Sequence, residues 1–179
     1  MTKKTDSVVV LGSFKLLRLE RKRDAVEVLG ILAILAPTLA FLINGGVAAA
    51  NDLASWFNAI NRLTALVGTS LLLIHMILVA RIPWLEQILG LDKLTHAHKK
   101  LGKPLLYLLL IHTFTALISY SISDGVGVLT TLVNLIGGYT DLLLAFIGLV
   151  LMILVVVSSI TAARRKLSYE AWYLIHLLS

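Results

Sequence analysis

The sequence predicts an all-α fold, a polytopic membrane helix bundle with four complete transmembrane helices and the start of a fifth. Composition is the first reason. The 179 residues are 58% hydrophobic and 15% charged, whereas soluble domains are about 45–50% apolar and about 25% charged. The second reason is that four uncharged runs are long enough to cross a bilayer, which takes about 20 residues. The third is that nearly all Lys and Arg residues lie in alternate loops between those runs.

The predicted spans follow one another along most of the chain. The four uncharged runs cover residues 28–51, 63–80, 104–123 and 142–163. A fifth apolar run begins at Ala171 and covers nine residues, so we expect it to be the first part of a fifth helix. Pro37 lies within the first span and is expected to kink it. Residues 81–103 include Pro83 and Trp84 with amphipathic turns, and this segment is expected to lie partly in the membrane interface.

The positive charges predict how the chain is oriented. Of the 16 Lys and Arg residues, seven precede the first span, five separate the second from the third, and three follow the fourth. Only Arg62 falls in the other set of loops, around residues 44–61 and 119–141. The positive-inside rule therefore predicts a multi-pass protein of the plasma membrane with its N-terminus in the cytoplasm. Residues 1–24 form a basic cytoplasmic segment, and residues 25–179 form the transmembrane domain.

Charge and composition also exclude several functions. The net charge of +6 is explained by topology, so the expected partner is the lipid bilayer and not a nucleic acid. Cysteine is absent, which excludes disulfides, thiolate metal sites, iron–sulfur clusters and Cys nucleophiles. The sequence has no Gly-rich phosphate loop, Rossmann fingerprint or Ser/His/Asp arrangement. Any metal chemistry must therefore use the five histidines and a few carboxylates.

His98 and His112 are the first candidate ligands. They are 14 residues apart, which on one helix places them about 40° apart in azimuth and about 21 Å apart along the axis. A single metal ion needs ligands three or four residues apart, so this spacing favours two stacked haems with axial imidazoles. Alternatively, His112 is a buried hydrogen-bonding residue and His98 a polar residue at the helix start. Pro104, between them, is expected to alter their relative orientation.

Three other histidines complete the set. His176 enters the fifth run from the same side as His98 and is expected to face it in one bis-histidine site. The histidine that pairs with His112 would lie about 13 or 14 residues beyond His176, because the two sites are separated by the same helical rise. His75, within the second span, is either a satisfied core histidine or a contact to a haem edge. His96 is interpreted as an interfacial residue and a possible substitute for His98.

Basic residues near these histidines have a second possible role. They are Lys99, Lys100, Lys103, Arg164, Arg165 and Lys166, and their main function is to set the topology. Haem propionates are anionic and are stabilised by a cationic rim. Lys99, Lys103 and Arg164 are therefore secondary site candidates.

Two stretches of the sequence resemble a known family. The first contains Arg81-Ile-Pro-Trp-Leu-Glu, Gly90-Leu-Asp-Lys-Leu, His98-Lys-Lys-Leu-Gly and then His112. The second is Arg164-Arg-Lys-Leu-Ser-Tyr-Glu-Ala-Trp-Tyr-Leu-Ile-His. In this order they resemble the ferric reductase-like transmembrane domain of ferric reductases and NADPH oxidases. The bacterial flavin-linked members are the most similar, and the resemblance is strongest over residues 61–176.

The resemblance implies six helices and two b-type haems, each bound by one histidine from the third helix and one from the fifth. His98 and His176 would bind the inner haem, and His112 would be one ligand of the outer haem. Electrons would pass from NAD(P)H through FAD, on a cytoplasmic reductase domain or subunit, to the haems and then to an acceptor. The chain is expected to be truncated before the sixth helix and the flavin domain, and to be inactive alone. It departs from the family at Lys99, usually Arg, and at Pro104.

Two functions of other classes remain as alternatives. One is a histidine-bearing transporter or ion-translocating subunit in which His75 and His112 relay protons or metal ions. It predicts carboxylates or broken helices in the membrane, and none of the four uncharged runs contains Asp or Glu. The other is a structural membrane anchor without a cofactor, which leaves the repeated histidine spacing unexplained.

Overall fold

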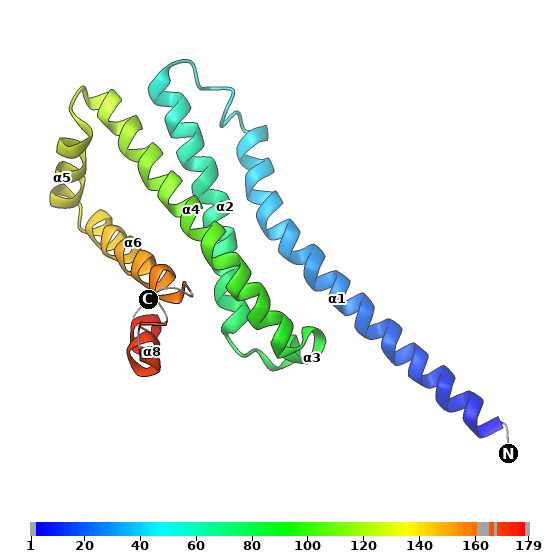
Figure 1. The fold of residues 1–179 in the computed structure, drawn as a ribbon. Helices are drawn as coiled ribbons and strands as arrows, with labels where there is room; N and C mark the ends of the chain where they lie inside the picture. The colour runs from blue at the N-terminus through cyan, green and yellow to red at the C-terminus, as the bar shows by residue number, and fades with distance from the viewer. Residues whose placement is uncertain (1–2, 161–164, 167, 178–179) are drawn as a thin grey trace.

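The computed structural model describes residues 3–160, 165–166 and 168–177, with side chains from residue 16 onward. This part of the chain is all-helical and contains no strand, which confirms the predicted fold class (Figure 1). Its helices are α1 (Lys3–Ile43), α2 (Leu53–Val79), α3 (Pro83–Leu89), α4 (Leu91–Asp124), α5 (Val128–Gly138), α6 (Thr140–Ser159) and α8 (Tyr169–Leu177).

Four of the described helices are long and apolar enough to cross a membrane. They are Leu16–Ile43 within α1, then α2, α4 and α6. Each contains most or all of one predicted span, and α8 contains the fifth apolar run up to Leu177. Pro37 lies inside α1 and Pro104 inside α4, and both helices continue past the proline. The four apolar helices make the chain a multi-pass membrane protein. Helices suit the bilayer core because water is absent there and a helix forms its own backbone hydrogen bonds.

Arg62 is not in a loop, contrary to the sequence prediction. The helix α2 begins at Leu53, ten residues before the predicted span, and Arg62 lies in its third turn. The Arg62 guanidinium lies 5.0 Å from the centre of the Phe41 ring on α1. A cation is stabilised by an aromatic face, and a long side chain near a helix end can reach the interface. These two effects allow α2 to include the charged Arg62 and to begin before the uncharged run.

The predicted loop at residues 119–141 is largely helical, which corrects a second expectation. Here α4 continues to Asp124, Gly125 adopts a left-handed φ of 65°, and α5 follows. The 11 residues of α5 extend only about 16 Å, too short to span a bilayer. This helix contacts both α4 and α6. A helix satisfies its backbone hydrogen bonds internally, which favours it over an irregular loop beside lipid.

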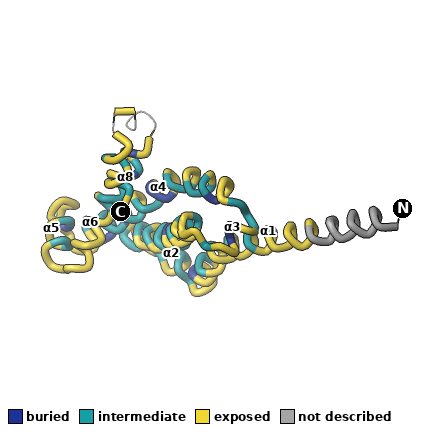
Figure 2. Tube along the Cα trace, turned by 90° about the horizontal axis from the view of Figure 1, so that it is seen from below, coloured by how far each residue is buried: buried dark blue, intermediate teal, exposed yellow. Residues whose placement is uncertain are grey.

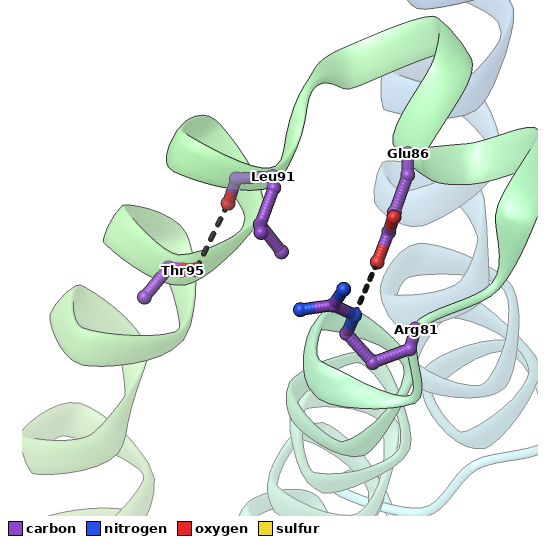
Figure 3. A network of polar contacts seen from close by, with 4 residues as sticks. All are labelled: Arg81, Glu86, Leu91 and Thr95. Atoms are coloured by element: carbon purple, nitrogen blue, oxygen red, sulfur yellow. Dashed lines mark hydrogen bonds and ion pairs between the residues drawn. The ribbon is translucent and has the colours of Figure 1, made fainter.

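Residues 80–90, which include α3, form a short connection between α2 and α4. Arg81 has a φ of 54°, and its Nε lies 2.7 Å from Oε1 of Glu86 on α3 (Figure 3). Gly90, with a φ of 84°, joins α3 to α4. On the other side of α3, Arg23 Nε donates a hydrogen bond of 2.7 Å to the carbonyl oxygen of Ile88. The first span is therefore tied to this connection by a charged side chain.

The burial pattern is that of a protein whose solvent is lipid. Most large apolar side chains on the long helices are exposed, and the few buried positions lie mainly between helices (Figure 2). The buried polar residues among those described are Thr115, Ser119, Thr131 and Ser158. Each hydroxyl donates to a backbone carbonyl, as hydroxyls in apolar surroundings must. Apolar surface therefore faces outward, and small or hydrogen-bonded side chains lie inside.

The most extensive helix contact joins α2 and α4, which run antiparallel and side by side. Three polar side chains of α4 contact backbone carbonyls of α2: His98 with His75, His112 with Asn61, and Ser119 with Ala54. Along α4 these residues are 14 and then 7 positions apart, and their partners on α2 are separated by the same intervals in the opposite direction. We call this contact the α2–α4 seam. Its seven-residue period is that of helices packed at a small angle.

Small and buried residues occupy the seam between those contacts. Leu105, 1% exposed, lies seven residues from both His98 and His112. The matching position on α2 is Gly68, which is buried. A small residue allows two backbones to approach closely, which is how transmembrane helices gain packing energy in lipid. Close approach is also what brings α2 carbonyls within reach of α4 side chains.

The cap of α2 provides a pH-dependent prediction. Asp52 Oδ1 accepts hydrogen bonds from the Ser55 hydroxyl at 2.6 Å and the Ser55 backbone N–H at 2.7 Å. These bonds hold the pKa of the Asp52 carboxyl below its ordinary value. The cap should be at full strength above that ordinary value and weaken as the pH falls through the lowered pKa. Hydrogen exchange in the first turn of α2, corrected for intrinsic rates, should accelerate at low pH. In Asp52→Asn this extra acceleration should be absent.

Candidate functional site

Three histidines from three helices meet at one end of the seam. The His98 ring on α4 stacks on the His75 ring of α2, with centroids 3.8 Å apart and planes 23° apart. The His176 ring of α8 lies on edge to His98 with centroids 6.2 Å apart. Residues 75, 98 and 176 are far apart in sequence, so only the fold brings them together. His96, two residues before His98, is exposed on α4.

Hydrogen bonding defines which nitrogen of each α4 histidine can act. His98 Nδ1 lies 3.4 Å from the His75 carbonyl oxygen, and His112 Nδ1 lies 3.1 Å from the Asn61 carbonyl oxygen. A carbonyl can only accept, so each Nδ1 donates its hydrogen. In the neutral form of each ring, Nε2 then keeps its lone pair, as in histidines that bind metals. The His98 and His112 rings therefore make the same type of contact with α2 through Nδ1.

The other predicted site residues lie in different surroundings. His112 is on α4, fourteen residues from His98, and is partly buried. Lys99 and Lys103 are exposed on the same helix. Arg164 lies outside the described residues. Within the described ranges, no group of three His, Asp or Glu side chains is arranged so that it could hold a metal ion.

Sequence reasoning missed the contribution of α2. It considered His75 only as a secondary candidate and did not consider Asn61. The signal was present, because Asn61 and His75 are separated by the same fourteen residues as His98 and His112. Matching intervals on two adjacent antiparallel helices indicate a shared seam. The interval alone does not show that both α4 rings bond to α2 backbone atoms.

A polar hollow lies at the opposite end of the seam. It has a volume of about 340 Å³ and is open to the surroundings. Ser119 in its wall lies seven residues from His112, which is about 10 Å along the helix. Its lining includes Asp52, Asn58 and Arg62 as well as hydroxyl groups. The hollow therefore offers both charges and hydrogen-bonding groups close to the second α4 histidine.

Comparison with protein families identifies the fold around these histidines. Residues 64–179 match the family described as the ferric reductase like transmembrane component, and this match covers more than half of the chain. The chain belongs to this family. The matched region contains α4, α8 and most of α2, the three helices that form the seam and the histidine cluster. Searches of curated proteins and of solved structures find no match to this ferric reductase-like chain.

Proposed function

We propose that the chain is the membrane-embedded, b-type haem-binding part of an oxidoreductase, and that His98 and His176 bind one haem. Electrons would come from a flavin and NAD(P)H reductase domain or subunit in the cytoplasm and leave to an acceptor across the bilayer. Membership of a membrane oxidoreductase family supports the general chemistry. The His98–His176 geometry is the single observation that carries the assignment to particular residues.

The spacing of those two rings fits an iron between them. Imidazole nitrogens bind metals at about 2.0 Å, so two rings on opposite sides of one ion have centroids about 6 Å apart. The His98 and His176 centroids are 6.2 Å apart. Each ring can rotate about its metal–nitrogen bond, so the 71° between the two ring planes is compatible with both histidines binding one iron. Their separation is too large for direct stacking and matches that expected for two histidines on one iron.

The surrounding residues would prepare this site in three ways. The His75 carbonyl accepts the Nδ1 hydrogen of His98, which would leave Nε2 to bind the iron. Trp172 lies beside His176, with ring centroids 5.1 Å apart, and helps to exclude water. Exposed Lys99 and Lys103 could provide positive charge for the propionates. A haem held by two histidines supplies one-electron transfer, since no coordination position is left for substrate.

The second α4 histidine would belong to an outer haem nearer the acceptor. His112 has the same carbonyl contact as His98, and the two lie about 21 Å apart along a straight helix. Arg81, just before α3, and the lysines of early α4 lie at the His98 end, which the positive-inside rule assigns to the cytoplasm. The hollow beside Arg62 would then open on the outer face. Electrons would therefore travel along α4 from the cytoplasmic to the outer side.

An absorption spectrum tests the proposal directly. The chain is produced in membranes with haem supplied, purified in detergent, and reduced with dithionite. We expect a sharp Soret band and a resolved α band in the reduced-minus-oxidised difference spectrum, as low-spin bis-histidine haem gives. Circular dichroism shows whether the helices are formed. A fully helical chain with neither band would reject the proposal and favour the histidine-bearing transporter.

A further inference from the structure

We propose that His75 is a positioning residue that holds the ring plane of His98, the proposed haem ligand, in one orientation. This inference rests on the proposed function, because it concerns the haem assigned to His98 and His176. The backbone of His75 accepts the hydrogen bond of His98 Nδ1, and its imidazole stacks on the His98 ring. One residue of α2 thus makes two different contacts with one ligand.

The two contacts restrict different motions of His98. With haem bound, an iron bond at Nε2 and the hydrogen bond at Nδ1 would hold the ring at two points on its edge. The remaining freedom is mainly rotation of the ring plane about the line between those points. A second ring stacked at 3.8 Å and 23° removes that freedom, because rotation would push the faces into contact. The stack therefore controls the ligand plane and the carbonyl controls the tautomer.

The equivalent position on α2 shows what the stack adds. Asn61 is fourteen residues before His75, and its carbonyl contacts His112 as the His75 carbonyl contacts His98. The Asn61 side chain is an amide and has no aromatic ring to stack. The same carbonyl contact thus occurs at both α4 histidines, but among the described residues of the seam the α2 residue carries an aromatic ring at His98 and an amide at His112. The ligand plane should be restrained at His98 by a contact that His112 lacks.

The free-energy cost of burying the His75 ring indicates that this residue has a role other than packing. Its Nδ1 is buried and has no hydrogen-bond partner among the residues that the structure describes. A buried polar atom without a partner is destabilising, so an apolar side chain would be less costly at this position. The ring also lies over Gly102, one turn beyond His98, where an added Cβ would be 3.8 Å from His75 Cε1. The His75 ring thus lies along the same face of α4 as His98.

Electron paramagnetic resonance and redox titration of the haem-loaded chain test this role. The g-values of low-spin ferric haem report how its two axial imidazole planes are oriented. We expect His75→Ala to broaden or shift the low-spin signal. We also expect it to change the reduction equilibrium by about tenfold, which is 59 mV for a one-electron couple. His75→Phe keeps an aromatic face without the ring nitrogens and should retain the wild-type signal. Asn61→Ala, the matched substitution at the equivalent position, should leave this signal unchanged.

Each result has a defined meaning for the inference. A wild-type signal and potential in His75→Ala would overturn it while leaving the haem assignment intact. An equal change in His75→Phe and His75→Ala would also overturn it, because the aromatic face would then be insufficient. If His75→Ala fails to fold, His75→Leu supplies the unstacked comparison, and a wild-type signal in it would count against the inference. Wild-type protein without haem would instead reject the proposed function.

Discussion

Replacing His98 with alanine is expected to abolish the low-spin haem spectrum of the chain. His98 supplies one of the two proposed ligands, and the substitution also removes the Nδ1 contact with α2. A haem left with His176 alone would become high-spin or dissociate, since each axial bond contributes to retention. The measurement is the haem content of the purified protein together with its reduced α band. His176→Ala should cause the same loss.

The matched control for this experiment is His96→Ala. His96 lies two residues before His98 on the same helix, but its side chain is exposed. The control changes the number of histidines and the helix composition equally, so it should retain the wild-type spectrum. Loss of haem in His96→Ala with retention in His98→Ala would show that the ligand assignment is wrong. Equal retention in both variants would exclude both residues as ligands.

Gly68→Leu is expected to disrupt the seam as a whole. Gly68 is buried on α2, and a Cβ at this position would lie 3.9 Å from Leu108 Cβ, so a larger side chain must push α4 away. Overpacking of this kind costs about 1–3 kcal/mol. The His98 and His112 carbonyl contacts lie seven residues on either side of this level, so both should lengthen. Thermal unfolding in detergent should occur at a lower temperature, with reduced haem content.

Two substitutions separate this effect from a general intolerance of change. In Gly68→Ala the added Cβ makes an ordinary contact, and alanine favours the helix by about 1 kcal/mol, so stability should be equal or higher. In Gly30→Leu the side chain extends from α1 into open space, so haem content should be unchanged. A Gly68→Leu protein with normal stability and haem content would show that the close approach of α2 and α4 is not required.

The seam gives α2 and α4 different parts in the proposed chemistry. The α4 helix supplies His98 and His112, whereas α2 supplies the backbone carbonyls that orient them. Helical carbonyls already accept intrahelical bonds, but an oxygen has two lone pairs and can accept a second hydrogen. Backbone atoms move less than side chains, which makes them suitable for holding ligands in place. Loss of the seam should therefore affect both sites together.

Much of the fold could be predicted from residue type alone. Uncharged runs predicted the spans because a charge within lipid is costly. A helix forms all its backbone hydrogen bonds within one segment, so each run is expected to cross the bilayer as a helix. The prediction was wrong where a charge is tolerated, at Arg62, whose guanidinium lies over Phe41 near the end of α2. It was also wrong at α5, which is too short for a span and was interpreted as loop. Both errors concern the ends of the bundle, where local contacts decide the structure.

By itself, the sequence determined that this is a multi-pass helical membrane protein with two histidines along one helix. Those properties depend on composition, charge and helical period, which act along the chain. Only the tertiary structure decided that His75 stacks against His98 and that α2 carbonyls contact both α4 rings. Which helices become neighbours depends on small residues such as Gly68 and on the register between surfaces, and these contacts join residues far apart in sequence.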